Sequence, residues 1–401
     1  MRNNISEKIE LLAPAGNYQS FMAAINGGAD AIYLGLSGGF NARGNIENFT
    51  TENLKETVEK AHLFGVKIYL TLNTLVKDEE IEEALEDVRF AIECKVDAFI
   101  VQDIGLANLL FQKFKNIELH ASTQMGASNL EGVKFLEGLG FKRVVLARET
   151  PLSEIRRIKD NTNVDIEYFI QGALCVGFSG NCYLCSLLAG ASGNRGKCKQ
   201  FCRLGYKING GKERYYLSTK DFCMLPSLKE LIDAGVTSLK IEGRARRPAY
   251  VASAVQTYRK ALENELKYSQ EDITNLKKVF NRGDYILGYF KGEKIIYSTV
   301  QNHIGIEIGK ILDVKKGKRF NEVILSSSHN LRAGDTLKLF DGEKEVMTVS
   351  PVDIKNIGKN KYLFTTTASI NKGMLVRLIV DSAYEEELLG KQRKIDFSAT
   401  M

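Results

Sequence analysis

Residues 11–35 read LLAPAGNYQSFMAAINGGADAIYLG, and this stretch decides the fold of the chain. A short apolar run (residues 11–16) precedes an amphipathic segment that ends at Gly27 and Gly28, and a second apolar run follows at residues 30–35. Two short apolar runs separated by one helical segment are typical of a βαβ unit, in which the two strands are parallel. The opening of the chain therefore predicts an α/β fold.

The same pattern continues through the next two hundred residues or so, with helical periodicity between the apolar runs. Six further candidate strands lie at residues 67–73, 98–104, 117–123, 143–149, 165–172 and 238–244. Eight strand–helix repeats within about 260 residues match the length of a TIM barrel. A doubly wound open sheet is the alternative, but no glycine-rich dinucleotide fingerprint follows the first strand. We expect a TIM-like (β/α)8 barrel.

The pattern changes in the last quarter of the chain. From about residue 295 onward, short β-rich runs alternate with turn signals such as AGD and DGE, which is typical of a small antiparallel β-barrel. We therefore predict a barrel domain over residues 1–290, with a cysteine-rich insertion at about 173–225, and a β-barrel domain over residues 295–385.

Composition narrows the class of protein. Hydrophobic residues make up 44% of the 401 residues and charged residues 26%, which is close to the globular average and excludes a disordered or fibrous chain. No apolar run approaches the roughly 20 residues that a membrane span needs. The first residues carry no apolar segment of a secretory signal. We expect a cytoplasmic protein that does not contact membranes.

Six of the seven cysteines lie between residues 175 and 223. This segment follows the seventh candidate strand, so its loop opens on the carboxyl-terminal face of the barrel, where active sites are built. Sulfur-only ligands at irregular spacing favour an iron–sulfur cluster. A zinc site is the alternative, although only Cys182 and Cys185 have the spacing of a zinc knuckle. Buried free thiols are the third interpretation.

A basic segment overlaps these cysteines. Residues 193–214 contain seven lysines and arginines and a single acidic residue, Glu213, so they carry as much net positive charge as the whole chain, +6. The segment could compensate the charge of a thiolate cluster, or it could bind the phosphate backbone of RNA. The residues that we expect to contact RNA are Arg195, Lys197, Lys199 and Arg203.

Polar residues on the candidate strands and at their ends form a third group. Strand ends converge on the mouth of a barrel, so their side chains can surround one small ligand, and the arginines and lysine favour an anion. Lys240 and Glu242 share a strand face and could also pair with each other. We expect catalytic roles for Asp103, His120 and Glu167, and substrate binding by Arg148, Gln171, Lys240, Glu242 and Arg244.

Several motifs make the chain similar to one known family. The pattern E-x-F-x2-G-A-L-C-x6-C, from Glu167 to Cys182, resembles the signature of the peptidase U32 (collagenase-like) family. Further matching stretches are FNARGNIENF (40–49), NRGKCKQFCR (194–203), STKDFC (218–223), SLKIEGRARRPAYV (238–251) and FNRGDYILGYF (280–290). The resemblance covers almost the whole chain and implies a TIM-like barrel followed by a small β-barrel.

The resemblance also implies an activity. Bacterial branches of this family are iron–sulfur proteins that hydroxylate RNA or a ubiquinone precursor without oxygen, with prephenate implicated as a co-substrate. Carried over by motif, the ligands of a 4Fe-4S cluster are Cys175, Cys182, Cys198 and Cys202. Cys223 is a reserve ligand, and Cys185 departs from the family pattern, in which serine is commoner at that position.

The favoured hypothesis is therefore an RNA hydroxylase that forms 5-hydroxyuridine in transfer RNA. The compact length of the chain favours transfer RNA over ribosomal RNA, where the product would be hydroxycytidine. A U32-type peptidase is the main alternative, although no HExxH or GxSxG motif is present and His120 is the only histidine at a candidate strand end. A non-catalytic zinc or RNA-binding protein is the third. A partner chain of the same family, or a second copy, is a further expectation.

Overall fold

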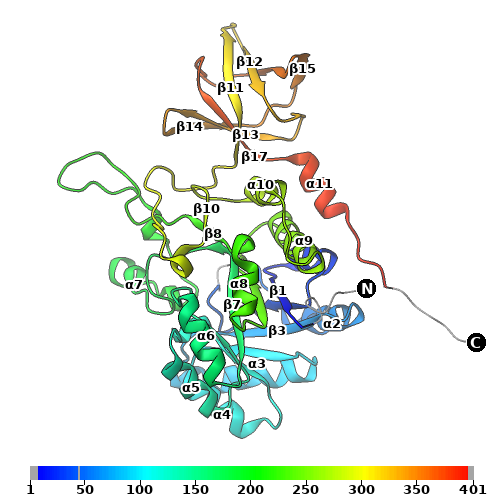
Figure 1. Cartoon of the computed structure of the whole chain (residues 1–401), viewed down its shortest axis with the longest axis vertical. Helices are drawn as coiled ribbons and strands as arrows, with labels where there is room; N and C mark the ends of the chain where they lie inside the picture. The colour runs from blue at the N-terminus through cyan, green and yellow to red at the C-terminus, as the bar shows by residue number, and fades with distance from the viewer. Residues whose placement is uncertain (1–7, 44–45, 396–401) are drawn as a thin grey trace, which may run out of the picture.

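The computed structural model describes residues 8–43 and 46–395, and within them the chain forms a closed barrel followed by a second sheet (Figure 1). All eight strands of the barrel coincide with the predicted apolar runs. They are β1 (Glu10–Pro14), β2 (Ala31–Leu34), β3 (Lys67–Leu72), β4 (Ala98–Val101), β5 (Leu119–Ala121), β6 (Arg143–Val145), β7 (Asp165–Ala173) and β9 (Ser238–Ile241). Parallel ladders join β1 to β7 in order, and β9 pairs with both β7 and β1, which closes the ring. The predicted TIM-like fold is confirmed.

Helices surround the barrel, and polar residues begin several of them. Asn17, Asp103 and Asn129 each accept a hydrogen bond from a backbone N–H of the first turn, which fixes where the following helix starts. The helices are α1 (Tyr18–Gly27), α2 (Thr51–Leu63), α3 (Ile81–Glu93), α4 (Ile104–Lys113), α5 (Leu130–Leu139), α6 (Leu152–Asn161), α8 (Leu228–Asp233) and α9 (Pro248–Glu263).

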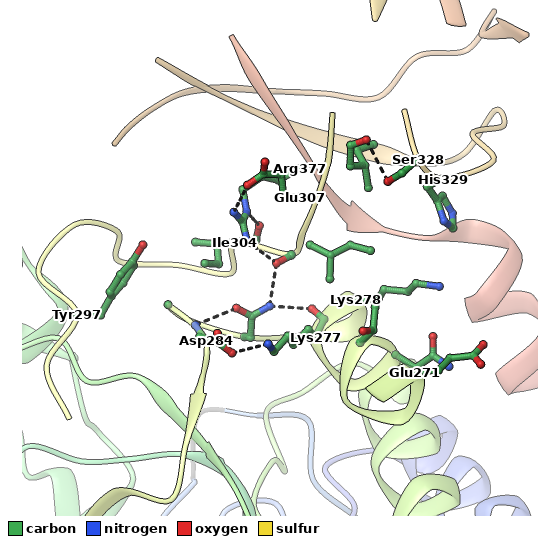
Figure 2. Close-up of a pocket in the computed structure, with 17 residues that line it drawn as sticks. Glu271, Lys277, Lys278, Asp284, Tyr297, Ile304, Glu307, Ser328, His329 and Arg377 are labelled. Atoms are coloured by element: carbon green, nitrogen blue, oxygen red, sulfur yellow. Dashed lines mark hydrogen bonds and ion pairs between the residues drawn. The ribbon is translucent and has the colours of Figure 1, made fainter. Parts of the chain in front are cut away.

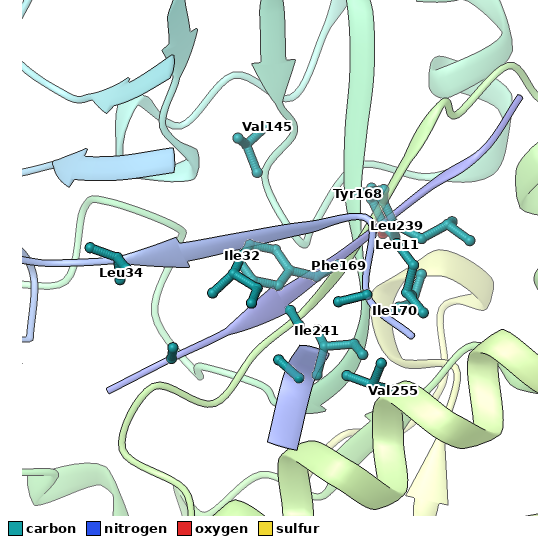
Figure 3. Close-up of a cluster of buried hydrophobic side chains, with 14 of the residues drawn as sticks. Leu11, Ile32, Leu34, Val145, Tyr168, Phe169, Ile170, Leu239, Ile241 and Val255 are labelled. Atoms are coloured by element: carbon teal, nitrogen blue, oxygen red, sulfur yellow. The ribbon is translucent and has the colours of Figure 1, made fainter. Parts of the chain in front are cut away.

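Apolar side chains from strands and helices form the main core. Figure 3 shows part of it, where Leu11 of β1, Ile170 of β7 and Leu239 of β9 lie close to Val255 of α9. These four side chains are fully buried. Removing such surface from water stabilises the fold by roughly 25 cal/mol per Å2, so the contact of α9 with β1, β7 and β9 helps to hold the closing strand in place.

The predicted insertion interrupts the barrel between β7 and β9. Residues 174–220, here called the cysteine loop, leave the end of β7 and contain one short helix, α7 (Leu184–Ala189). The chain returns through β8 (Asp221–Cys223), which runs antiparallel to β7 and also pairs with β10 (Tyr285–Ile286). Ala173 and Asp221 face each other in this ladder, so both ends of the cysteine loop start from one place at the barrel's carboxyl-terminal face.

The second part of the chain is antiparallel β, as predicted. Its strands pair in the order β14-β13-β17-β11-β12-β16-β15, and bulges in β11 and β14 curve the sheet around its own buried core. The strands are β11 (Ile306–Lys315), β12 (Asn321–Ser327), β13 (Thr336–Asp341), β14 (Lys344–Val349), β15 (Lys355–Gly358), β16 (Lys361–Thr366) and β17 (Leu375–Val380).

Two helices connect the sheet to the barrel. In Figure 1, α10 (Gln270–Val279) lies between the two parts, and α11 (Ser382–Gly390) returns from the sheet to α9. Figure 2 shows a polar pocket of about 690 Å3 between α10 and the sheet. Its cations are paired with carboxylates, as in Lys277–Asp284 (2.5 Å) and Lys278–Asp381 (3.0 Å).

His303 is the central side chain of this connection. Its Nδ1 accepts hydrogen bonds from the backbone N–H groups of Asn281 (3.0 Å) and Gly305 (3.3 Å), and its Nε2 faces the carbonyl oxygens of Lys278 and Ile379. Burial lowers the pKa of His303 to about 4. The ring is therefore held neutral, because a proton on Nδ1 would face two N–H donors.

Since the folded pKa of His303 lies below the ordinary value of 6.5, its contribution to stability is present at neutral pH and is lost as the pH falls toward 4. We expect this group alone to lower the free energy of unfolding by about 2 kcal/mol between pH 7 and pH 5. The variant His303→Gln, which keeps a donor and an acceptor but does not titrate, should lack that part of the pH dependence in urea unfolding. Equal pH dependence in both proteins would contradict this role.

Candidate functional site

The cysteine loop carries the four predicted cluster ligands. Cys175, Cys182 and Cys198 are exposed, and Cys202 is half-buried. The thiol of Cys202 interacts electrostatically with those of Cys175 and Cys182, so these three lie near one another. The loop therefore brings thiols together that are up to 27 residues apart in the sequence.

Cys185 and Cys198 form a second group in the same loop. Cys185 is buried, it hydrogen-bonds to Cys198, and its Sγ accepts from the backbone N–H of Lys199 at 3.3 Å. Burial, together with the neighbouring Cys185, raises the pKa of the Cys198 thiol to about 11. Cys223 lies apart from these cysteines, since it is buried beneath α9 with its Sγ 3.5 Å from the hydroxyl of Tyr258.

Two arginines hold the cysteine loop to the barrel. Arg203 is buried and donates to the Ser218 hydroxyl (2.9 Å) and the Leu174 carbonyl (3.1 Å), so it joins the two ends of the loop. Arg195 forms a bidentate ion pair with Glu80, in the segment that precedes α3. Both arginines were expected to contact RNA. The donors of Arg203 are used inside the protein, whereas Arg195 donates three hydrogen bonds to Glu80 and the Leu75 carbonyl and stays one-third exposed.

The loop also requires close backbone contact with the barrel. Gly180 has a φ of +78°, and a Cβ there would lie 1.9 Å from the carbonyl oxygen of Gln124, in the 3-10 turn after β5. Asn194 donates to the carbonyl of Gly180 at 2.7 Å. Only glycine fits at this position, and the contact places the loop over the ends of the barrel strands.

Beneath the loop, the mouth of the barrel is rich in arginine. Arg244, after β9, is buried and donates to the side-chain oxygens of Asn41 (3.2 Å) and Thr71 (3.0 Å). Burial lowers the pKa of Arg244 to about 10. No carboxylate forms a salt bridge with Arg244 among the described residues, so this cation is solvated only by neutral groups.

Three more charged side chains surround the same point. The hydroxyl of Tyr33 interacts electrostatically with Glu242, Arg244, Arg43 and Arg148 together. Arg43 lies 3.5 Å from Glu242, and the guanidinium of Arg148 stacks on Phe169 with its Nε buried and without a hydrogen-bond partner among the residues that the structure describes. We call Arg43, Arg148, Glu242 and Arg244 the mouth site. Three cations and one anion leave it a surplus of positive charge.

Arg43 links the mouth site to the cysteine loop. Its guanidinium interacts electrostatically with Glu242 and also with the thiols of Cys175 and Cys198. The position of Arg43 in the sequence does not mark it as a site residue, because it follows the end of β2 by nine positions rather than ending the strand. Its place in FNARGN, a stretch that resembles the family pattern, was the available signal.

Glu167 and Lys240 lie inside the barrel rather than at its mouth. The Nζ of Lys240 donates to Glu167 at 2.6 Å, and Arg143 approaches the other oxygen of Glu167 at 3.3 Å. Arg143 also pairs with Glu10, and both are the first residues of their strands, which places this network toward the amino-terminal end. Although burial opposes ionisation, Lys240 and Arg143 lower the pKa of Glu167. Lys240 therefore pairs with Glu167, and not with Glu242.

His120 belongs to the same interior. It is fully buried, its ring packs edge-on against Tyr69, and its Nε2 lies 2.9 Å from Glu118, which precedes β5. Burial lowers the pKa of His120, so the ring is neutral. The expectation that His120 lies at the mouth is corrected: alternation along a strand predicts an inward side chain but not its depth in the barrel.

Asp103 and Gln171 are also engaged elsewhere. The carboxylate of Asp103 accepts from the backbone N–H groups of Leu106 (2.9 Å) and Val76 (3.2 Å), so it caps α4. The Oε1 of Gln171 accepts from Tyr258 of α9 at 3.2 Å, which turns this side chain to the outer side of β7. Of the predicted site residues on the strands, the structure brings only Arg148, Glu242 and Arg244 together at the mouth.

The four predicted RNA contacts divide into two pairs. Lys197 and Lys199 are exposed and form no ion pair within the described residues, whereas Arg195 and Arg203 are anchored as above. Lys207 and Lys212 are exposed on a neighbouring hairpin, in which Tyr206 pairs with Arg214. The free cations of the basic segment therefore lie on the outer side of the cysteine loop.

The sequence profile of peptidase family U32 matches residues 16–298, which include the barrel from α1 onward and the whole cysteine loop. The chain belongs to peptidase family U32. The match ends before β11, so the family pattern covers the part of the chain that holds both the cysteines and the mouth site.

Relatives of this U32 protein carry different names. The 23S rRNA 5-hydroxycytidine synthase of Escherichia coli K12 is 37% identical over 89% of this chain, which spans 56% of that larger protein. A collagenase of Porphyromonas gingivalis is 34% identical, over 92% of this chain and 94% of its own length. A tRNA hydroxylation protein of Bacillus subtilis is 34% identical over 86% of both chains.

Two further observations concern metals and membranes. Within residues 8–43 and 46–395, no three His, Cys, Asp or Glu side chains are already arranged to hold a metal ion. No helix in the part of the chain that the structure describes is long and apolar enough to cross a membrane.

The position of Glu167 predicts a structural role that can be separated from catalysis. In Glu167→Gln, Lys240 loses its carboxylate and Arg143 keeps Glu10 and the more distant Asp165 (3.9 Å), so we expect unfolding to become easier by about 3–5 kcal/mol. Glu230→Gln breaks a solvent-exposed pair with Lys291 and should cost less than about 1 kcal/mol. Urea unfolding compares the two variants. A Glu167→Gln protein of unchanged stability would show that the carboxylate is not holding the barrel.

Proposed function

We propose that this U32 protein is an oxygen-independent RNA hydroxylase that forms 5-hydroxyuridine in transfer RNA. The observation that carries the proposal is the cysteine loop: its thiols lie next to Arg43, at the edge of a mouth site with surplus positive charge. The names of the relatives from Escherichia coli and Bacillus subtilis support RNA hydroxylation as the type of reaction.

In this proposal Cys175, Cys182, Cys198 and Cys202 hold a 4Fe-4S cluster. The donors suit one in their chemistry, because they are thiols on a single loop and thiolates are the standard ligands of such clusters. Since no three of them are arranged around one point within the described residues, the loop would draw them together when the cluster binds. The buried Arg203 and Arg282 interact with Cys202 and so offset the negative charge of thiolates. A bound cluster supplies one-electron redox chemistry.

The mouth site has the chemistry to bind prephenate, a dicarboxylate, as co-substrate. The forked guanidinium groups of Arg148 and Arg244 suit carboxylates, and a buried arginine without a carboxylate partner gains most from an anionic ligand. Arg43 stands between this position and the thiols. Lys197 and Lys199 would bind RNA phosphates beside the cluster, so that the target base enters above the mouth.

A peptidase is the second candidate, and one observation favours it: the Porphyromonas gingivalis collagenase aligns over nearly its full length. The histidines argue against a cysteine protease. His120 lies inside the barrel, His303 in the connection to the sheet, and His62 and His329 pair with Asp97 and Asp381. Gelatin cleavage by metal-free protein that is lost in Arg244→Ala would support the peptidase.

Nucleoside mass spectrometry of RNA tests the proposal directly. Cells that lack the gene should lose 5-hydroxyuridine from transfer RNA, and wild type should restore it. Cys198→Ser should restore less than about one hundredth, because the cluster would lose a ligand. Cys94→Ser, in a buried cysteine outside the loop, is the matched control and should restore the modification fully. Loss of hydroxycytidine from ribosomal RNA instead would show that ribosomal RNA, and not transfer RNA, is the substrate. Unchanged nucleosides in both RNAs would refute the proposal.

Arg244 should determine the affinity for the co-substrate. In Arg244→Lys the positive charge remains, but the two-pronged contact with a carboxylate is lost, so we expect prephenate to bind about tenfold more weakly. Calorimetric titration of the full-length protein measures this without turnover. Arg156→Lys, on the exposed face of α6, is the control and should bind like wild type. Equal affinity in all three proteins would exclude Arg244 from the prephenate site.

A further inference from the structure

The second sheet carries a concentrated positive charge that the site does not use. Its strands and turns, residues 306–380, contain thirteen lysines and arginines and eight acidic residues. Four of these cations lie in one stretch, KKGKRF, which starts at the last residue of β11 and leads into β12. We call residues 315–320 the basic turn. All six of its residues are exposed.

The charges of the basic turn are almost uncompensated within the protein. Lys315 lies 3.6 Å from Glu322, and both side chains are mostly exposed. Lys316, Lys318 and Arg319 form no ion pair within the described residues. Neighbouring like charges repel one another, and a polyanion that replaces its counterions with these cations releases those ions to solution. The basic turn therefore has the charge arrangement of a phosphate-binding surface.

An aromatic side chain completes the turn. Phe320 is 55% exposed and does not belong to the buried core of the sheet. A base can stack on an exposed aromatic ring, whereas a free phosphate or a polyanion without bases gains no stacking from it. The combination of three free cations and an exposed ring favours RNA over other polyanions.

The geometry of the turn presents this ring in a defined place. A Cβ on Gly317 would lie 2.2 Å from the carbonyl oxygen of Phe320, so the chain closes tightly between these residues. Asn321 follows directly, pairs with Thr366 in the sheet, and donates to the Ala368 carbonyl at 3.0 Å. Phe320 is thus carried by an ordered strand end, which reduces the entropy lost on binding.

The basic turn lies far from the mouth site. In Figure 1 the loop between β11 and β12 is at the end of the sheet that points away from the barrel. The cysteine loop reaches the same sheet, where Arg214 of its hairpin approaches Glu343 in the turn after β13 at 3.9 Å. A large ligand could therefore contact the cysteine loop and the second sheet at the same time.

We propose that the basic turn is a second RNA-binding surface, at which Lys316, Lys318 and Arg319 bind backbone phosphates and Phe320 stacks on a base. This inference rests on the proposed function, because it assigns a distant contact to the same RNA. It gives the second sheet a role: it selects RNAs large enough to extend from the mouth site to the turn.

Binding of unfractionated transfer RNA to the full-length protein tests the proposal. The triple variant Lys316→Ala, Lys318→Ala, Arg319→Ala should bind about tenfold more weakly, and the slope of log K against log salt should decrease by about two to three. The matched control removes the exposed cations Lys113, Lys115 and Lys134 from the far side of the barrel. Thermal unfolding of each variant should equal that of wild type, since none of the six cations pairs within the described residues.

Phe320→Ala separates RNA from other polyanions. We expect it to weaken transfer RNA binding about five- to a hundredfold, and to leave the binding of heparin, which has no bases, unchanged. Binding of the turn to phosphatidylserine vesicles without loss of RNA affinity in either variant would overturn the proposal in favour of a membrane contact.

The outcomes distinguish the two proposals. If wild type binds transfer RNA and the turn variants bind equally well, this inference fails while the proposed function stands. If turn variants lose RNA affinity but the nucleosides of the gene-deleted cells are unchanged, the protein binds RNA without hydroxylating it. If wild type binds no RNA, both proposals fail.

Discussion

Closure of the barrel by β9 is the constraint on which the rest of the structure depends. β9 lies between β7 and β1, so residues 10–12 must pair with residues 238–240, more than two hundred positions away. The cysteine loop is inserted between the two strands that complete this closure. Because β8 returns along β7, the loop begins and ends at one point on the barrel's rim. Ordering such a segment costs about 1–2 kcal/mol per residue in backbone entropy, and Arg203 and Arg195 offset part of that cost.

The buried cations at the two ends of the barrel differ in how many carboxylate partners they have. Toward the amino-terminal end, Arg143 and Lys240 are matched by Glu10 and Glu167 within hydrogen-bonding distance. At the mouth, Arg43, Arg148 and Arg244 surround Glu242, and within the described residues only Arg43 forms a salt bridge with it. Matched buried charges hold a structure together without needing a ligand, whereas unmatched ones favour an anion from solution. The asymmetry agrees with the general placement of barrel active sites at the carboxyl ends of the strands.

The sequence was enough to predict the strands and helices, but it did not predict how deep a side chain lies in the barrel or which residue it pairs with. Apolar runs and turn residues were enough to find all eight barrel strands and the antiparallel second sheet, because a buried strand requires a short run of apolar residues between turn residues. The depth of Glu167 and His120 could not be read, since alternation reports which face a side chain takes and not how far along the strand it lies.

The sequence shows where basic residues cluster, but it does not show which carboxylates they pair with. The basic segment was visible, but the pairing of Arg195 with Glu80, far away in the sequence, depends on the folded chain. Arg43 was missed because it reaches the mouth from a loop after β2.

A backbone contact between residues 296–297 and the end of the cysteine loop joins the two parts of the molecule. The segment that leads to the second sheet lies against the end of the cysteine loop: Thr219 pairs with Ile296, and the backbone N–H of Tyr297 donates to Ser218. The same short stretch therefore holds the end of the thiol-bearing loop and leads into the second sheet, so the loop and the sheet share one backbone attachment.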